Sequence, residues 1–150
     1  MTTLTITGNL TSDPELKFTQ TGKAVASFTV VTSKSKKNQD GTWENTDVTF
    51  WNVKAWDKLA ENIADTLRKG MTVIVQGTAV QENWDDKNTG EKRSRLGVTA
   101  WNVGVDLKRH NYQVTMVSRN SEGDYEVDPW TQPAWQNTPK QEKQEEAFPF

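Results

Sequence analysis

Several residue types and segments are scarce or absent in this 150-residue chain, and each absence excludes a class of protein. There is no cysteine, which excludes disulfides and thiolate metal sites. The only histidine is His110, and no nucleophile elbow, phosphate loop or HExxH-type pattern occurs. Asp85 and Asp86 are adjacent acids in a predicted hairpin tip without a second acidic cluster. We therefore predict no catalytic residues, no metal site and no cofactor.

Long hydrophobic runs are also lacking. No segment approaches the ~18 consecutive apolar residues of a membrane-spanning helix, and the start MTTLTITGNL has neither the basic nor the apolar region of a signal peptide. We expect a soluble, cytoplasmic protein with no membrane partner. Hydrophobic residues make up 33% of the chain and the mean hydropathy is −0.81, which is low for a chain that is folded throughout. Part of it is therefore expected to be disordered.

Charge is distributed unevenly along the chain. The formal net charge is −2, but residues 1–111 hold 15 Lys and Arg against 13 Asp and Glu, whereas residues 112–150 hold 3 against 7. Because the front part is slightly basic and the acidic residues are concentrated at the end, the acidic net charge of the whole chain does not exclude a nucleic-acid ligand.

Alternating apolar residues predict a sheet protein with one helix. The helix is expected to open with Asp57 as its N-cap and to end at Gly70, and Gly77 indicates a bulge or bend. Strands are predicted over residues 3–10, 24–33, 48–56, 71–80 and 93–103, with short extended pieces over 15–19 and 112–117. The fourth strand is expected to continue outward over residues 81–84 into a polar hairpin, DDKNTGEK. One helix between the third and fourth strands is the order of a five-stranded antiparallel OB-fold barrel.

The apolar positions of these elements form the predicted core. They are Ala26, Phe28, Val30, Val53, Ala55, Leu59, Ile63, Leu67, Val73, Val75, Leu96, Val98 and Ala100. The sequence places Trp101 either in the core or on the surface, and Trp51 either in the core or at a subunit interface.

The strand over residues 48–56 has two different faces. Val53 and Ala55 lie on the apolar face, while Phe50, Lys54 and Trp56 lie on the other. Aromatic rings stack with unpaired bases, at about 1–3 kcal/mol per base, and cations neutralise phosphates. The pattern therefore predicts a single-stranded nucleic-acid site, formed by Phe50, Trp56, Trp84, Lys34, Lys36, Lys37, Lys54, Arg93 and Arg95. An OB module for RNA, a carbohydrate-binding module and, least favoured, a metal-dependent nuclease are the alternatives.

Three segments resemble a known family: ITGNLTSDPELKFTQTGKAVASFTV, FWNVKAWDKLAENIADTLRKG and MTVIVQG. They are similar to the bacterial-type single-stranded DNA-binding proteins, especially the actinobacterial and bacteriophage members. The resemblance covers about residues 2–117 and the last six. It implies an OB fold, a homotetramer, and single-stranded DNA bound by aromatic and basic residues in replication, recombination and repair. The family's stacking aromatics correspond to Phe50, Trp56 and Trp84. A further family tryptophan falls near Lys36, and Trp43 is a candidate to replace it across the hairpin.

The end of the chain differs in composition from the predicted barrel. Residues 1–117 are expected to form the OB domain and residues 118–144 a disordered linker. Residues 145–150 read Glu-Glu-Ala-Phe-Pro-Phe. The resemblance implies that this acidic and hydrophobic tip recruits replication and repair proteins through Glu145, Glu146, Phe148, Pro149 and Phe150. On composition alone, a solubilising tail is the alternative.

Overall fold

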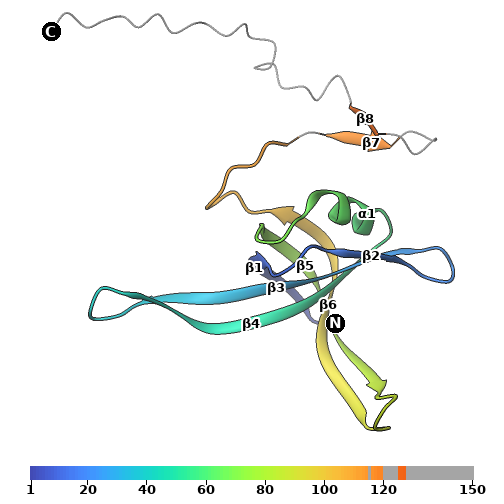
Figure 1. Ribbon diagram of the computed structural model, residues 1–150, viewed down its shortest axis with the longest axis horizontal. Helices are drawn as coiled ribbons and strands as arrows, with labels where there is room; N and C mark the ends of the chain where they lie inside the picture. The colour runs from blue at the N-terminus through green and yellow to red at the C-terminus, as the bar shows by residue number, and fades with distance from the viewer. Residues whose placement is uncertain (115, 120–124, 128–150) are drawn as a thin grey trace, which may run out of the picture. The chain divides into compact units, whose positions relative to one another are not determined.

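The computed structural model describes residues 1–114, 116–119 and 125–127, and divides the chain into two units, Met1–Asn111 and Tyr112–Phe150. The first unit contains one helix among six strands (Figure 1). Its elements are β1 (Thr3–Leu10), β2 (Glu15–Phe18), β3 (Ala24–Lys37), β4 (Trp43–Trp56), α1 (Asp57–Thr66), β5 (Thr72–Asp85) and β6 (Lys92–Val105).

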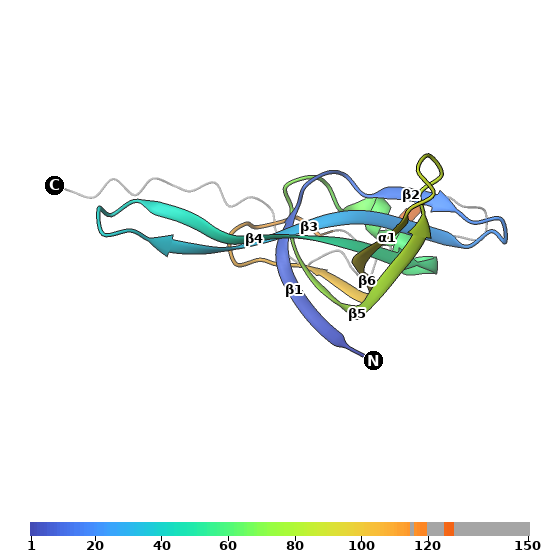
Figure 2. The same ribbon diagram turned by 90° about the horizontal axis from the view of Figure 1, so that it is seen from below.

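The strands of the first unit close into a ring (Figures 1 and 2). Their order is β1-β5-β6-β4-β3-β2, and β1 also pairs with β3, which joins the two sides. The predicted OB-fold barrel is confirmed, with the short β2 added beside β3. One of its pairings, β4 with β6, is parallel rather than antiparallel. This follows from geometry, because five strands in a closed ring cannot all alternate in direction.

Two glycines lie where strands approach closely. A Cβ atom on Gly8 would meet the carbonyl oxygen of Val31, and one on Gly77 would meet that of Thr99. The first contact lies where β1 passes onto β3. The register of β5 against β6 shifts between Gln76 and Gly77, where Trp101 is the extra residue, so the bulge is in β6 opposite Gly77 and not in the strand of Gly77. A side chain at either glycine would push the strands apart.

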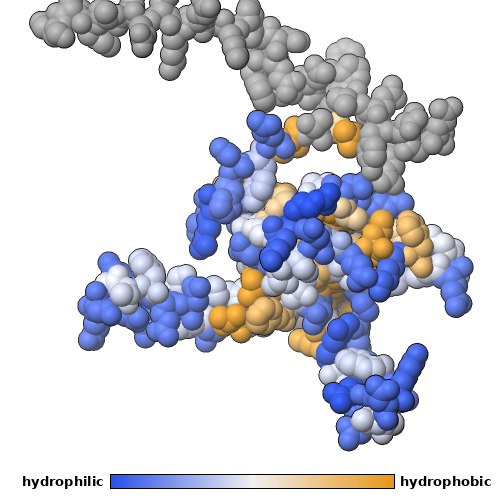
Figure 3. Space-filling view, viewed as in Figure 1, coloured by the Kyte–Doolittle hydropathy of each residue, from blue (hydrophilic) through white to orange (hydrophobic). Residues whose placement is uncertain are grey.

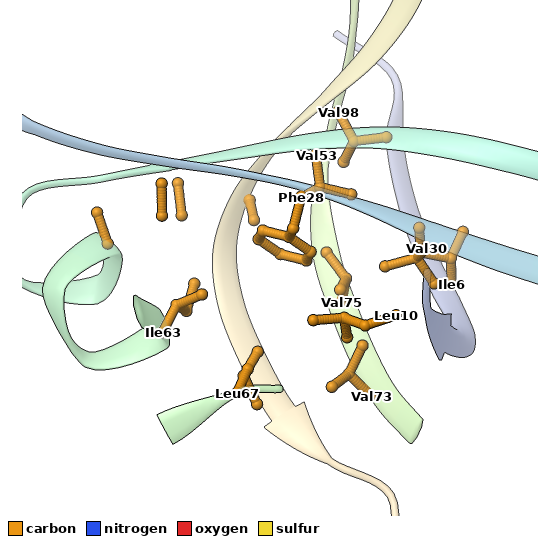
Figure 4. Packing of buried hydrophobic residues seen from close by; sticks show 14 of the residues in the cluster. Ile6, Leu10, Phe28, Val30, Val53, Ile63, Leu67, Val73, Val75 and Val98 are labelled. Atoms are coloured by element: carbon orange, nitrogen blue, oxygen red, sulfur yellow. The ribbon is translucent and has the colours of Figure 1, made fainter. Parts of the chain in front are cut away.

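The hydrophobic core fills the inside of the ring, and α1 covers one end of it (Figure 4). Almost all of the predicted core positions are buried, and Leu59 packs against them from the edge. Leu96 is the exception, because its side chain is exposed. Leu96 pairs with Gln81, beyond the point where β5 and β6 leave the barrel. Its side chain points to the same side of β6 as Val98 and Ala100, but there is no core on that side so far along the hairpin.

The ends of α1 differ from the prediction. The N-cap is Trp56 and not Asp57, and no side chain caps this end. Trp56, the last residue of β4, has the extended backbone that an N-cap requires, and α1 begins at Asp57, whose φ of 58° is not yet that of a right-handed helix. The helix ends at Thr66, before Gly70. The Arg68 guanidinium donates to the carbonyl oxygens of Ala64 and Leu67 at 2.8 and 2.7 Å, which gives hydrogen-bond donors to carbonyl groups at the end of the helix.

Two hairpins extend well beyond the barrel. The strands β3 and β4 pair as far as Lys37 and Trp43, and β5 and β6 as far as Asp85 and Lys92. The β3–β4 hairpin is longer than predicted, because backbone pairing continues where no core imposes an apolar alternation. The β5–β6 hairpin agrees with the predicted outward extension to Trp84 and return from Arg93 to within one residue. Their outer parts are mostly hydrophilic in Figure 3, which shows one face of the molecule.

In the second unit, β7 (Val117–Arg119) pairs with β8 (Tyr125–Val127) in a two-stranded antiparallel sheet. The extended piece expected over residues 112–117 is therefore wrong: residues 112–114 and 116 are not in a strand, and β7 starts at Val117. Periodicity across so few residues is a weak signal. Residues 145–150, the predicted interaction tip, lie outside the described residues. Within the described part of the chain, no helix has the length and apolar character of a membrane span.

Candidate nucleic-acid interface

The outer side of β4 presents aromatic and cationic side chains away from the core. Phe50, Lys54 and Trp56 lie on this side, which we call the β4 face. Phe50 is 63% exposed and Trp56 is 39% exposed, whereas Val53 and Ala55 on the other side are buried. Trp56 is held in place by two features, its pairing with Val25 in β3 and its position at the start of α1. The predicted division of this strand into a core face and a free face is confirmed.

A second surface lies on the β5–β6 hairpin. Glu82 is opposite Arg95 and Trp84 is opposite Arg93, and directly opposed residues of an antiparallel pair share a face. We call these four residues the β5–β6 face. The guanidinium carbon of Arg95 lies 5.6 Å from the centre of the Trp84 ring, a cation–π contact. Trp84 is nevertheless 44% exposed, so part of its ring is free to contact a ligand.

Glu82 joins the two faces. One of its carboxylate oxygens accepts a hydrogen bond from the Lys54 ammonium, and the other accepts from Arg95 Nε at 2.9 Å. The hydrogen bond from Lys54, and then that from Arg95, holds the pKa of the Glu82 carboxyl below its ordinary value. The carboxylate is therefore charged at neutral pH, and it fixes cations from β4 and β6 at one place.

The cations of this interface already have partners in the free protein. Lys54 and Arg95 share Glu82, and Arg93 Nε lies 2.9 Å from a carboxylate oxygen of Asp86. A hollow of about 260 Å³ adjoins Lys54 and Arg95 and is also lined by Asp13. A phosphate that binds here would have to share these cations with the carboxylates or displace the carboxylates. The carboxylates therefore weaken the attraction between the cations and a phosphate, and they fix the positions of the cations.

Two of the predicted lysines lie on the other side of the β3–β4 hairpin. Lys34 is opposite Thr46 and Lys36 is opposite Glu44, whereas Lys37 is opposite Trp43. Because side chains alternate along β3, Lys37 shares the face of Val31, the partner of Phe50, while Lys34 and Lys36 do not. Lys34 is also paired with Asp47 at 3.3 Å. The structure therefore separates Lys34 and Lys36 from the other predicted site residues.

Several residues could not be assigned before the structure was known. Glu82 was missed, although alternation along its strand places it on the same face as Trp84. Of the two open tryptophans, Trp51 is half-buried and its Nε1 donates to Thr32 Oγ1 at 3.0 Å. Trp101 is exposed, so it is not a core residue. Asp86 pairs with Arg93 and accepts from the backbone N–H of Asn88 at 2.9 Å, which makes it part of the hairpin turn.

The architecture places the chain in the OB-fold class: a closed ring of five strands with one helix between the third and fourth. A family model described as "Single-strand binding protein family" matches residues 1–106. The chain belongs to this family.

Similar proteins occur in actinobacteria. The chain is 39% identical over 121 residues to the "Single-stranded DNA-binding protein" of Paenarthrobacter aurescens, covering 80% of this chain and 70% of that protein. It is 40% identical over 120 residues to the protein of the same name from Mycobacterium tuberculosis (strain ATCC 25618 / H37Rv), covering 79% and 73%. Among solved structures, the small single-stranded DNA-binding protein from Streptomyces coelicolor matches with a TM-score of 0.61 at 24% identity, covering 72% of this chain and 96% of that one. This structural match supports the fold.

Proposed function

We propose that this protein binds single-stranded DNA with little dependence on base sequence. One observation carries the proposal: exposed aromatic rings lie among cations on two faces that Glu82 joins. Trp84 lies against Arg95, and Lys54 connects this pair to Phe50 and Trp56 on β4. Unpaired bases can stack on the rings while their phosphates contact the cations, and stacking is tolerant of sequence because every base has a flat face. The names of the actinobacterial relatives support the same ligand.

The role that we propose is protection and organisation of exposed DNA strands during replication, recombination and repair in the cytoplasm, without turnover of a substrate. We also propose that the protein assembles as a homotetramer. Support for assembly comes from Ile74 and Trp101, large apolar side chains that stay exposed on β5 and β6. Light scattering of the purified protein measures its mass; the mass of one chain would contradict the tetramer and leave DNA binding untouched.

The C-terminal tip is proposed to recruit replication and repair proteins. Its support is chemical: Phe148, Pro149 and Phe150 offer an apolar contact beside the carboxylates of Glu145 and Glu146. Deleting residues 148–150 should leave DNA affinity unchanged and abolish the recruitment of repair proteins in a pull-down. An undiminished pull-down would contradict the role of the tip.

The ligand is tested by titrating the protein with labelled oligo-dT at two salt concentrations and following tryptophan fluorescence and anisotropy. We expect quenching of tryptophan and a loss of affinity at the higher salt, because phosphate contacts release counterions. Binding that does not change with salt would contradict phosphate recognition, as in a carbohydrate-binding module. Competition by matched RNA is the second arm, because tighter binding of RNA would point to a site that reads the 2′-OH.

A further inference from the structure

The outer end of the β3–β4 hairpin carries a tryptophan that the interface described above does not use. Trp43 is the first residue of β4 and is opposite Lys37. Its side chain is 70% exposed, more than that of Phe50, Trp56 or Trp84. A large apolar ring on a projecting hairpin cannot pack into the core. Its exposure therefore indicates a binding surface for a ligand or a partner.

A β-bulge sets the face on which Trp43 lies. Trp43 and Phe50 are seven residues apart, and strict alternation would place them on opposite faces. The register shifts between Thr32 and Lys34, where Asp47 and Val48 together oppose the single residue Ser33. Asp47 has a φ of 53°, a conformation that Asp adopts more readily than most residues. The extra residue reverses the alternation, so that Trp43 and Phe50 lie on one face of the hairpin.

This shared face can be followed along β3. Lys37, the partner of Trp43, and Val31, the partner of Phe50, are six residues apart on β3, which keeps an even spacing. Six strand residues span about 20 Å. The face therefore runs without interruption from the β4 face, at the barrel, to Trp43 at the outer end of the hairpin.

The acidic residues of the hairpin are not partners of Lys37. Glu44 is on the other face, opposite Lys36, the Asp47 carboxylate is paired with Lys34, and Asp40 in the turn accepts from the backbone N–H and the hydroxyl of Thr42. The face of Trp43 instead carries Lys37 and, next along the ladder, Asn45, whose side-chain oxygen accepts from Ser35 Oγ at 3.2 Å. A flat ring beside a cation that forms no ion pair among the described residues suits a nucleobase and its phosphate.

We infer that Trp43 is an additional stacking platform that extends the DNA path along the β3–β4 hairpin, with Lys37 as its phosphate contact. This inference rests on the proposed function. It adds a binding site about 20 Å beyond Phe50, so only strands long enough to leave the barrel reach it.

The test compares two labelled oligo-dT lengths, about 5 nucleotides, near the lower limit of one OB-fold's site size, and about 30 nucleotides. For Trp43→Ala, we expect the affinity for the long strand to fall at least about fivefold, which corresponds to the lower limit of one stacked base. The affinity for the short strand should stay within about twofold of wild type. Trp43→Phe keeps a flat ring and should recover most of the loss. Equal affinities of wild type and Trp43→Ala for the long strand would overturn the inference.

A transposed variant tests the face itself. Trp43→Ala combined with Glu44→Trp moves the indole to the opposite face and removes a negative charge. The charge change alone would favour DNA binding, so a loss of affinity like that of Trp43→Ala supports the assigned face. Wild-type affinity would overturn it. Photo-crosslinking to iodo-substituted oligo-dT gives a direct readout: a cross-link at Trp43 is expected, and its absence while Trp84 cross-links would contradict the platform.

Two further results have separate meanings. If wild type binds neither strand, the proposed function fails, whereas retained binding with no effect of Trp43 removes only the platform. If Trp43→Ala lowers the mass in solution, Trp43 contacts a second copy of the chain, and the inference is again overturned.

Discussion

The two projecting hairpins present the same residue types in different states. On the β5–β6 hairpin, Trp84 lies against Arg95, and each arginine of the face is paired with a carboxylate. On the β3–β4 hairpin, Trp43 is mostly exposed, and within the described residues Lys37 forms no ion pair. The first surface is therefore held by ion pairs and a cation–π contact in the free protein, whereas the second lacks an ion pair at Lys37 among the described residues. A preorganised contact loses less conformational entropy on binding, so it should contribute more affinity for each residue.

Among the substitutions proposed, Trp84→Ala should lower the affinity for oligo-dT the most. It removes a stacking surface and the aromatic partner of Arg95, and we expect a loss of about 1–3 kcal/mol in binding free energy for oligo-dT. Trp56→Ala should cost an amount in the same range on the β4 face. Fluorescence anisotropy measures both. Unchanged affinity in both variants, with an intact circular dichroism spectrum, would mean that the interface is assigned wrongly.

Glu82→Gln should act in the opposite direction. It removes the negative charge that Lys54 and Arg95 share, so both cations become fully available to phosphate. We expect affinity to rise several-fold at low salt, and the dependence of log K on log salt to become steeper. Glu82→Asp, which keeps the charge, is the control. Weaker binding by Glu82→Gln would show that the carboxylate positions the cations more than it neutralises them.

The lysine and arginine of the two hairpins should differ in their effect on salt dependence. Lys37→Ala should reduce the slope of log K against log salt by about 0.7, the value for one phosphate contact with a single strand. Arg93→Ala should reduce it less, because Asp86 already neutralises Arg93. Titrations of oligo-dT of about 30 nucleotides at several salt concentrations give both slopes. Equal slopes would indicate that Asp86 releases Arg93 completely when DNA binds.

The smallest expected effect concerns stability and pH. Because the pKa of Glu82 is lowered in the folded state, its ion pairs stabilise the protein above the ordinary value of 4.5, and this stabilisation is lost as pH falls through the folded pKa. Glu82 is partly exposed, so the contribution should be below about 1 kcal/mol. Urea unfolding should therefore show a small deficit for Glu82→Gln at pH 7 that disappears at acidic pH. A deficit that persists unchanged at acidic pH would require another cause.

Alternation predicted the barrel because the core imposes it. Val53, Val75 and Val98 are buried where the period of two places them, and the division of β4 into two faces follows from the same rule. Outside the core this signal is lost. Leu96 keeps the alternation but has left the barrel, and the length of the β3–β4 hairpin depends on backbone pairing that needs no apolar residues.

The exposure of the aromatic residues was predictable from the sequence, and the placement of the charged residues less so. Rings such as Trp84 were identifiable because a large apolar side chain beside polar neighbours is unusual. Lys34 and Lys36 were wrongly grouped with the other cations, although the alternation of Ala26, Phe28 and Val30 along β3 already places both lysines on the side of the strand that faces the core lower down. The role of Glu82 depends on Lys54 lying within reach, 28 residues earlier in the chain. Contacts between strands distant in sequence leave no periodic signal.

The parallel pairing of β4 with β6 has a consequence for the ring as a whole. It extends only from Asn52↔Gly97 to Lys54↔Thr99, and Lys54 at its end is bound through Glu82 to Arg95 of β6. A strand of DNA that contacts Lys54 and Arg95 therefore spans the short parallel seam between β4 and β6. DNA bound at this place would hold the two strands together, so it should raise the melting temperature of the protein.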